Sequence, residues 1–169
     1  MKTNQFGKKG WTPDRIGNLN GKVFVITGTT SGTGFEATKI LLSKGAKVVM
    51  LNRNPKKVQD TIATLKQELG NDIDITNIQM DLSEQVSVKK ATEEILKTVP
   101  KIDALICNAA IAQVPKQTLT TDDWESQMGT NYYGNFTLQA LLFPLIEKSK
   151  GRIVTVGSLG YDMGIKTIK

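Results

Sequence analysis

The residues with the strongest chemical signal lie at 27–34, where the sequence reads Thr-Gly-Thr-Thr-Ser-Gly-Thr-Gly. An apolar run precedes them, and a helix-like segment begins near Phe35. Gly28 lets the chain turn sharply after a strand, and Gly32 and Gly34 lack the Cβ atoms that would keep phosphate and helix apart. The free N–H groups of a helix N-terminus also attract an anion. The spacing predicts a dinucleotide pyrophosphate site, with a glycine-rich turn of no function as the alternative.

The second predicted strand ends in a basic residue where dinucleotide sites often carry an acid that accepts from the adenosine ribose. Residues 51–54 read Leu-Asn-Arg-Asn, and no Asp or Glu occurs from 37 to 59. Arg53 can instead pair bidentately with a 2′-phosphate. The sequence therefore favours NADP(H) over NAD(H), and the alternative for Arg53 is a solvated surface arginine.

Two further segments follow predicted strands. Asp81 comes directly after the third strand, where its carboxylate could accept from the adenine amino group. Alternatively, Asp81 compensates the positive end of the next helix, beside Ser83. After the fourth strand, residues 108–110 read Asn-Ala-Ala. Small side chains there would let the backbone touch a flat ribose or adenine, although an isolated Ala-Ala pair carries no information.

Asn131 and Ser158 are the candidates for catalysis. Asn131 lies three residues before Gly134 inside an otherwise apolar helical pattern, where both residue types fit poorly. Such misfits concentrate at functional sites, although a tolerated interior polar group is the plain alternative. Ser158 follows the fifth strand at its carboxyl edge, where parallel sheets bind ligands. A serine in that position can also be a simple cap or turn residue.

Strands and helices alternate along the chain. Apolar runs predict strands at 22–27, 48–51, 73–80, 103–107 and 152–156. Helical patterns occur at 32–44, with Gly45 predicted to end that helix, from Pro55 after an Asn54 cap, after a Ser83 cap, and at 121–147, where Pro144 should kink or end the regular part. This alternation predicts the α/β class, a Rossmann-type doubly wound parallel sheet in three α/β/α layers. A polar N-terminal arm, 1–20, would precede a dinucleotide-binding domain at 21–169.

Composition narrows the function classes. The net charge is +6, but +4 of it lies in residues 1–22, so a nucleic-acid-binding face is not expected. No stretch reaches the ~20 apolar residues of a transmembrane helix. The single cysteine, Cys107, suits a reducing compartment, which predicts a cytoplasmic protein. The absence of histidine removes the commonest metal ligand and general base, so no metal site is expected.

In order and spacing, these segments resemble the short-chain dehydrogenase/reductase family across about residues 20–160. Arg53 and residues 11–16 are most similar to its retinol-dehydrogenase-like branch, which includes relatives of protochlorophyllide reductase. The resemblance implies an NADP(H)-dependent oxidoreductase that transfers hydride between nicotinamide and a small hydrophobic alcohol or carbonyl substrate. It implies that Ser158 hydrogen-bonds the substrate oxygen and that Asn131 holds a water in a proton relay. The implied cofactor-binding residues are Gly28, Thr30, Ser31, Gly32, Thr33, Gly34, Arg53, Asp81, Leu82, Asn108, Ala109 and Ala110.

The acid/base pair of that family, a tyrosine four residues before a lysine, does not occur in this sequence. The tyrosines are Tyr132, Tyr133 and Tyr161, and the residues four positions later are Phe136, Thr137 and Ile165. We therefore expect a truncated form of a longer reductase, inactive alone, with about five strands, an exposed fifth strand, and oligomerisation possible only for the longer form. The alternatives are a non-catalytic dinucleotide-binding module and an interaction fragment whose fifth strand pairs with another polypeptide.

Overall fold

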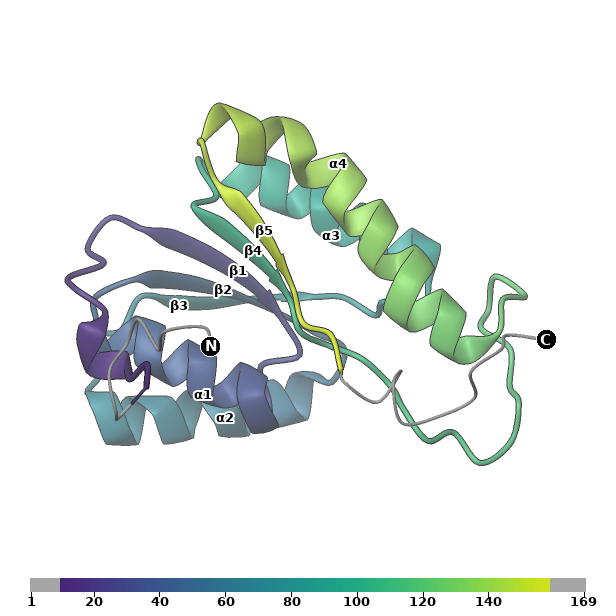
Figure 1. The fold of residues 1–169 in the computed structure, drawn as a ribbon, viewed down its shortest axis with the longest axis horizontal. Helices are drawn as coiled ribbons and strands as arrows, with labels where there is room; N and C mark the ends of the chain where they lie inside the picture. Colours follow the sequence, from purple (N-terminus) through teal and green to yellow (C-terminus); the bar gives the residue numbers. More distant parts are fainter. Residues whose placement is uncertain (1–9, 159–169) are drawn as a thin grey trace, which may run out of the picture.

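The computed structural model describes residues 10–158 of the chain. Its five strands form one parallel sheet in the order β3-β2-β1-β4-β5 (Figure 1). The strands are β1 (Val23–Thr27), β2 (Lys47–Asn52), β3 (Ile75–Gln79), β4 (Ala104–Cys107) and β5 (Arg152–Thr155). The helices are η1 (Pro13–Arg15), α1 (Gly32–Ser43), α2 (Pro55–Leu69), α3 (Gln85–Thr98), the π-helical η2 (Met128–Gly134) and α4 (Asn135–Lys148). Figure 1 shows α1 and α2 on one face of the sheet and α3 and α4 on the other, which confirms the predicted Rossmann-type fold.

Strand β2 shows why the central strands read as unbroken apolar runs. Successive side chains of a strand point to opposite faces of the sheet. Val48 and Met50 accordingly pack in the core under α1 and α2, while Val49 and Leu51 pack in the core under α3 and α4. All four side chains are buried. Because both faces of the sheet are covered, both sets of positions must be apolar.

The order of the strands creates a crevice at the carboxyl end of β1. From β1 the chain moves outward through β2 to β3, then crosses back to β4 and β5 on the opposite side of β1. Strands β2 and β4 both pair with β1 in parallel, with Val25 opposite Val49 and Leu105. The connections that leave β1 and β4 therefore diverge to opposite faces of the sheet. Open α/β sheets bind their ligands at this kind of reversal point.

Local signals placed most element boundaries correctly. Asn54 caps α2 by accepting from the Lys57 N–H at 3.1 Å, and Gly45 follows α1 with a positive φ of 85°, as predicted for these positions. The prediction that Ser83 caps the third long helix is wrong. Helix α3 begins at Gln85 after Glu84, because the Ser83 hydroxyl donates to Asp81 and a different carboxylate, that of Asp122, accepts from the Gln85 N–H at 2.8 Å.

The long helix predicted at 121–147 begins later and is irregular. Residues 118–126 instead form a tight turn, closed by an antiparallel bridge between Leu119 and Glu125. The Glu125 carboxylate accepts from the N–H groups of Gln127 and Met128 at 3.0 and 2.8 Å, so the helical segment starts there. These bonds lower the pKa of Glu125. Pro144 does not end α4, which continues to Lys148.

Strand β5 is one edge of the sheet within residues 10–158, as expected, since it pairs only with β4. Its Val154 and the following Val156 are 40% and 49% exposed. Helix α4 and η2 also expose apolar side chains, including Tyr132 and Phe136 at 57% and 62%. In the same part of the chain, no helix combines the length and apolar character needed to cross a bilayer.

Candidate functional site

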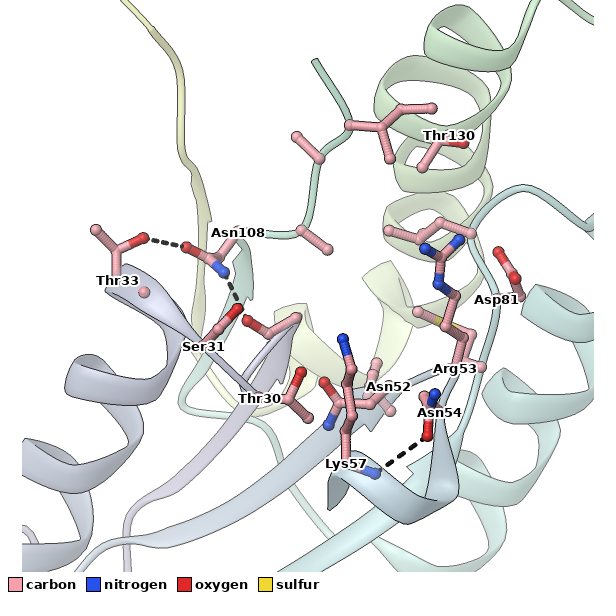
Figure 2. Close-up of a pocket in the computed structure, with 18 residues that line it drawn as sticks. Thr30, Ser31, Thr33, Asn52, Arg53, Asn54, Lys57, Asp81, Asn108 and Thr130 are labelled. Atoms are coloured by element: carbon pink, nitrogen blue, oxygen red, sulfur yellow. Dashed lines mark hydrogen bonds between the residues drawn. The ribbon is translucent and has the colours of Figure 1, made fainter. Parts of the chain in front are cut away.

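A pocket of about 420 Å³ lies at the carboxyl ends of β1, β2 and β4 (Figure 2). The cofactor-binding residues expected from the sequence all line it except Gly34. The structure therefore brings together four segments that are far apart in sequence: the glycine turn, the end of β2, the end of β3 and the end of β4. The sequence did not single out the remaining lining residues, which are Leu51, Asn52, Asn54, Lys57, Met80, Ile111 and Thr130.

The glycine turn is closely packed against the end of β4. Gly28 has a φ of 70°, and a Cβ there would lie 2.8 Å from the Cβ of Ala109. Gly34 does not line the pocket but lies in the first turn of α1, where a Cβ would lie 2.5 Å from Asn108 Nδ2 and closer still to the carbonyl oxygen of Gly28. The two glycines thus let α1 approach β1 and β4. As a result, the N-terminus of α1 lies at the pocket, where its dipole favours an anion.

Asn108 connects the glycine turn to β4 through its side chain. Its Nδ2 donates to the carbonyl oxygens of Thr27 and Gly28 at 3.1 and 3.0 Å, and its Oδ1 accepts from the Thr33 hydroxyl at 2.8 Å. The N–H groups of Asn108 and Ala109 both donate to Thr27 Oγ1. Every polar atom of the Asn108 side chain is therefore used to hold the turn, which makes it a rigid part of the pocket wall.

Asn52 holds the same turn from the other side. It ends β2, is 6% exposed, and its Oδ1 accepts from the Thr29 N–H at 2.9 Å. Its Nδ2 donates to Thr29 Oγ1 at 2.8 Å and to Asn77 Oδ1 at 3.1 Å. The sequence contained a signal for this role, because a polar residue at the end of a fully buried strand needs hydrogen-bond partners.

Two cationic side chains stand at the end of β2. Arg53 and Lys57 both line the pocket, and Figure 2 shows the Lys57 amine and the Arg53 guanidinium rising into it. Neither forms an ion pair with any described residue. Lys57 was missed at the sequence level, although its position in the first turn of a helix that starts at Pro55 places it near Arg53.

Asp81 lies at the rim of the pocket, in a turn before α3, and its predicted contact with adenine stays a prediction. It lines the pocket, while its Oδ1 accepts from the Ser83 N–H at 2.9 Å and from the Ser83 hydroxyl at 2.7 Å. Its own N–H donates to Ser87 Oγ at 2.9 Å. The carboxylate is thus fixed in a local turn before α3 at the rim of the pocket.

The two catalytic candidates do not line this pocket. Asn131 lies in η2, and its side chain accepts from the Ile111 N–H and donates to the Ile111 carbonyl oxygen, both at 2.8 Å. Ile111 itself lines the pocket, so Asn131 is linked to the pocket wall through one residue. Ser158 is exposed and follows β5. Tyr161 lies outside the described residues.

Cys107 lies near the pocket, at the end of β4, but its thiol is expected to be unreactive. Burial raises the pKa of its thiol to about 11, although a hydrogen bond from Gln139 acts in the opposite direction. At neutral pH the thiol is protonated and is therefore a poor nucleophile. Across the described part of the chain, His, Cys, Asp and Glu form no group of three or more that could hold a metal ion.

Known proteins are similar to this chain in sequence. The family described as short chain dehydrogenase matches residues 22–168. A short-chain dehydrogenase/reductase from Armillaria gallica is 34% identical, covering 93% of this chain and 52% of the relative. Retinol dehydrogenase 14 from Mus musculus is 35% identical, covering 88% of this chain and 47% of the relative. The chain therefore spans about half the length of these relatives.

Solved structures share the fold of this chain. An uncharacterised protein from Mycobacterium paratuberculosis superposes with a TM-score of 0.76 at 32% identity, covering 90% of this chain and 52% of that chain. L-sorbose reductase from Gluconobacter frateurii, solved with NADPH and L-sorbose, superposes with a TM-score of 0.73 over 88% of this chain and 57% of that chain. Its 20% identity supports the shared fold alone.

Proposed function

This chain belongs to the short-chain dehydrogenase/reductase family, and we propose that it forms the cofactor-binding part of an NADP(H)-dependent oxidoreductase. The reaction would move a hydride between nicotinamide and an alcohol or carbonyl carbon. Since the chain spans about half of its relatives, the activity and substrate of the whole protein belong to this proposal. The observation that carries it is a pocket that combines a glycine turn at a helix N-terminus with two cations that lack ion-pair partners among residues 10–158.

The residues present fit the cofactor. Phosphate oxygens need N–H donors and close approach to the backbone, and the start of α1 after Gly32 offers both. A Cβ at Gly28 or at Gly34 would clash with neighbouring atoms, and Gly28 also has a positive φ that other residues rarely adopt. Bound NADP(H) would supply the hydride, and this chain would supply the binding energy and the orientation of the nicotinamide.

Arg53 and Lys57 support the choice of NADP(H). An NAD(H) site of this fold uses a carboxylate after the second strand, and this chain has the neutral Asn52, whose amide is already hydrogen-bonded to Thr29 and Asn77. A 2′-phosphate would place its negative charge between the Arg53 guanidinium and the Lys57 amine, which are the free cations of the pocket wall in the described structure. Hydrogen bonds to charged groups contribute about 1.5–3 kcal/mol each.

The catalytic roles of Asn131 and Ser158 remain proposals. Ser158, at the carboxyl edge of β5, would hydrogen-bond the substrate oxygen. Asn131 would support a proton relay through its position, since its amide is engaged by Ile111. We also propose that the 169-residue chain binds the cofactor without turnover, because none of its tyrosines is followed four residues later by lysine.

The substrate class of the protein follows from its relatives only by analogy. The name of retinol dehydrogenase 14 supports a hydrophobic alcohol or carbonyl as the substrate class here. The apolar side chains that α4 exposes are a candidate contact in a homo-oligomer of the longer form. The division into an arm, 1–20, and a domain, 21–169, and a cytoplasmic location are further parts of the proposal.

Nucleotide titration of substituted chains tests the proposed function. Arg53→Ala and Lys57→Ala should each raise the Kd for NADPH by roughly 10- to 100-fold while changing the Kd for NADH little, because only NADPH carries the 2′-phosphate. Lys56→Ala is the matched control, since Lys56 is the exposed neighbour of Lys57 and does not line the pocket. Equal losses for NADPH and NADH, or no loss for either, would contradict NADP(H) selectivity.

A further inference from the structure

The helix that leads into α4 changes its hydrogen-bonding pattern beside the pocket. Residues Met128–Gly134 form a π-helix, in which carbonyls bond five residues ahead instead of four. Thr130, inside this segment, is 8% exposed and lines the pocket. The next residue, Asn131, holds Ile111 in the pocket wall by two hydrogen bonds. The path of the π-helix therefore sets the position of two lining residues.

Asn135, the first residue of α4, supplies the hydrogen bonds that this irregular path requires. In a regular α-helix its N–H would donate to the carbonyl oxygen of Asn131, four residues back. Here that N–H donates to the carbonyl oxygen of Tyr132. The side-chain Nδ2 of Asn135 donates in its place to the Asn131 oxygen at 3.1 Å, and also to the Thr130 oxygen at 3.4 Å.

The orientation of this amide is fixed by its surroundings. Both contacts are carbonyl oxygens, which can only accept, so the NH₂ group must face them. Asn135 is 6% exposed, and its Oδ1 is buried with no hydrogen-bond partner in the described structure. An unpaired buried oxygen costs free energy, which an apolar residue of the same shape would avoid. Packing alone therefore does not account for an asparagine at this buried position, whereas its hydrogen bonds to the two carbonyl oxygens do.

Close contacts fix the segment on either side of Asn131. A Cβ at Gly134 would clash with the carbonyl oxygen of Leu82, another lining residue, and a Cβ at Gly129 would lie 2.5 Å from Thr120 Cγ2. The π-helix is thus pressed against the loop after β3 and the turn at 118–126. Movement of this segment would be transmitted directly to the pocket wall.

We propose that Asn135 is a positioning residue of the nucleotide pocket. By holding the carbonyls of Thr130 and Asn131, it keeps the π-helical path and so keeps Thr130 and Ile111 in the wall. The inference rests on the proposed function for its effect on nucleotide binding, but its structural part does not. The role is indirect, because Asn135 does not line the pocket.

Backbone amide exchange of the full chain, combined with nucleotide titration, tests this role. Asn135→Leu should speed exchange of the Ile111 N–H by roughly 2- to 10-fold, the range of one net hydrogen bond, and should raise the Kd for NADPH by a similar factor. Exchange of the Leu105 N–H in β4 should not change. Gln139→Leu is the matched control: it makes the same amide-to-leucine change one turn later on α4, where the amide contacts Cys107.

Two further measurements test the role of Asn135. Asn135→His should restore slow exchange at Ile111, because the imidazole Nδ1–H can occupy the place of Nδ2. In the unsubstituted chain, the side-chain amide protons of Asn135 should exchange more slowly than those of Asn18, a result that does not depend on whether a variant folds. Unchanged Ile111 exchange in Asn135→Leu, equal effects of Asn135→Leu and Gln139→Leu, or fast Asn135 side-chain exchange would each overturn the role. Failure of the unsubstituted chain to bind NADPH would refute the proposed function, and Ile111 exchange would still decide the role of Asn135.

Discussion

Replacing Gly34 by alanine adds one methyl group where the structure has no room for it. A Cβ at this position would lie 2.5 Å from Asn108 Nδ2 and closer still to the backbone oxygen of Gly28. Neither neighbour is the far end of a flexible side chain, because Asn108 is held by Thr27 and Thr33. The glycine turn itself must therefore shift, although Gly34 does not line the pocket.

The magnitude follows from three opposing terms. Overpacking by a methyl group costs about 1–3 kcal/mol. Loss of the 3.0 Å hydrogen bond from Asn108 Nδ2 to Gly28 costs about 1 kcal/mol more. Alanine is better than glycine inside a helix by about 1 kcal/mol, and this offsets one of the losses. The free energy of unfolding should fall by about 1–3 kcal/mol in total.

Urea denaturation measures the loss of stability, and NADPH titration measures the effect on the pocket. Gly34→Ala should lower the urea midpoint and weaken NADPH binding, since the displaced turn lines the pocket in which the proposed pyrophosphate site lies. Gly17→Ala is the control, because its Cβ would meet nothing within 4 Å and Gly17 lies outside the pocket. If Gly34→Ala matches the unsubstituted chain in both midpoint and Kd, the turn is not packed as described.

Three other predictions concern pH, reactivity and the end of β4. Burial opposes ionisation of Asp103, but hydrogen bonds from Lys22, the Val23 N–H and Lys101 lower its pKa overall. Its stabilising effect should therefore be complete at neutral pH and fade as pH falls below the ordinary aspartate range, so that the urea midpoints of Asp103→Asn and the unsubstituted chain should converge as the pH is lowered further. Cys107, with a pKa of about 11, should react with a maleimide at pH 7 far more slowly in the folded chain than in urea, and equal rates would show that it is exposed. Asn108→Ala should cost about 2–4 kcal/mol of unfolding free energy because it breaks several partly buried hydrogen bonds, and an unchanged urea midpoint would argue against its role in holding the turn.

The sequence predicted the fold because its signals are local. The apolar run of β2, the Asn54 cap and the glycine after α1 depend on residues within a few positions, and the structure confirms each. The pocket was also predictable in outline, because parallel strands place their carboxyl ends together. Apart from Gly34, the residues expected to bind a cofactor line one pocket for this reason.

The features that the sequence did not predict depend on contacts between segments that are distant in the chain. The cap of α3 comes from Asp122, 37 positions after Gln85, and displaced the local candidate Ser83. The late start of the last helix depends on the turn at 118–126 and on Glu125. The sequence shows that Asn131 fits poorly in a helix. It does not show that the side chain of Asn135 takes the place of a backbone N–H donor to the Asn131 carbonyl oxygen.

Calorimetric titration of the 169-residue chain with NADPH and with NADH, at one fixed ionic strength, decides whether the pocket is an NADP(H) site. NADPH should bind at least about tenfold more tightly, since the 2′-phosphate adds charged hydrogen bonds to Arg53 and Lys57. Equal affinities, tighter binding of NADH, or no binding of either nucleotide would contradict NADP(H) selectivity.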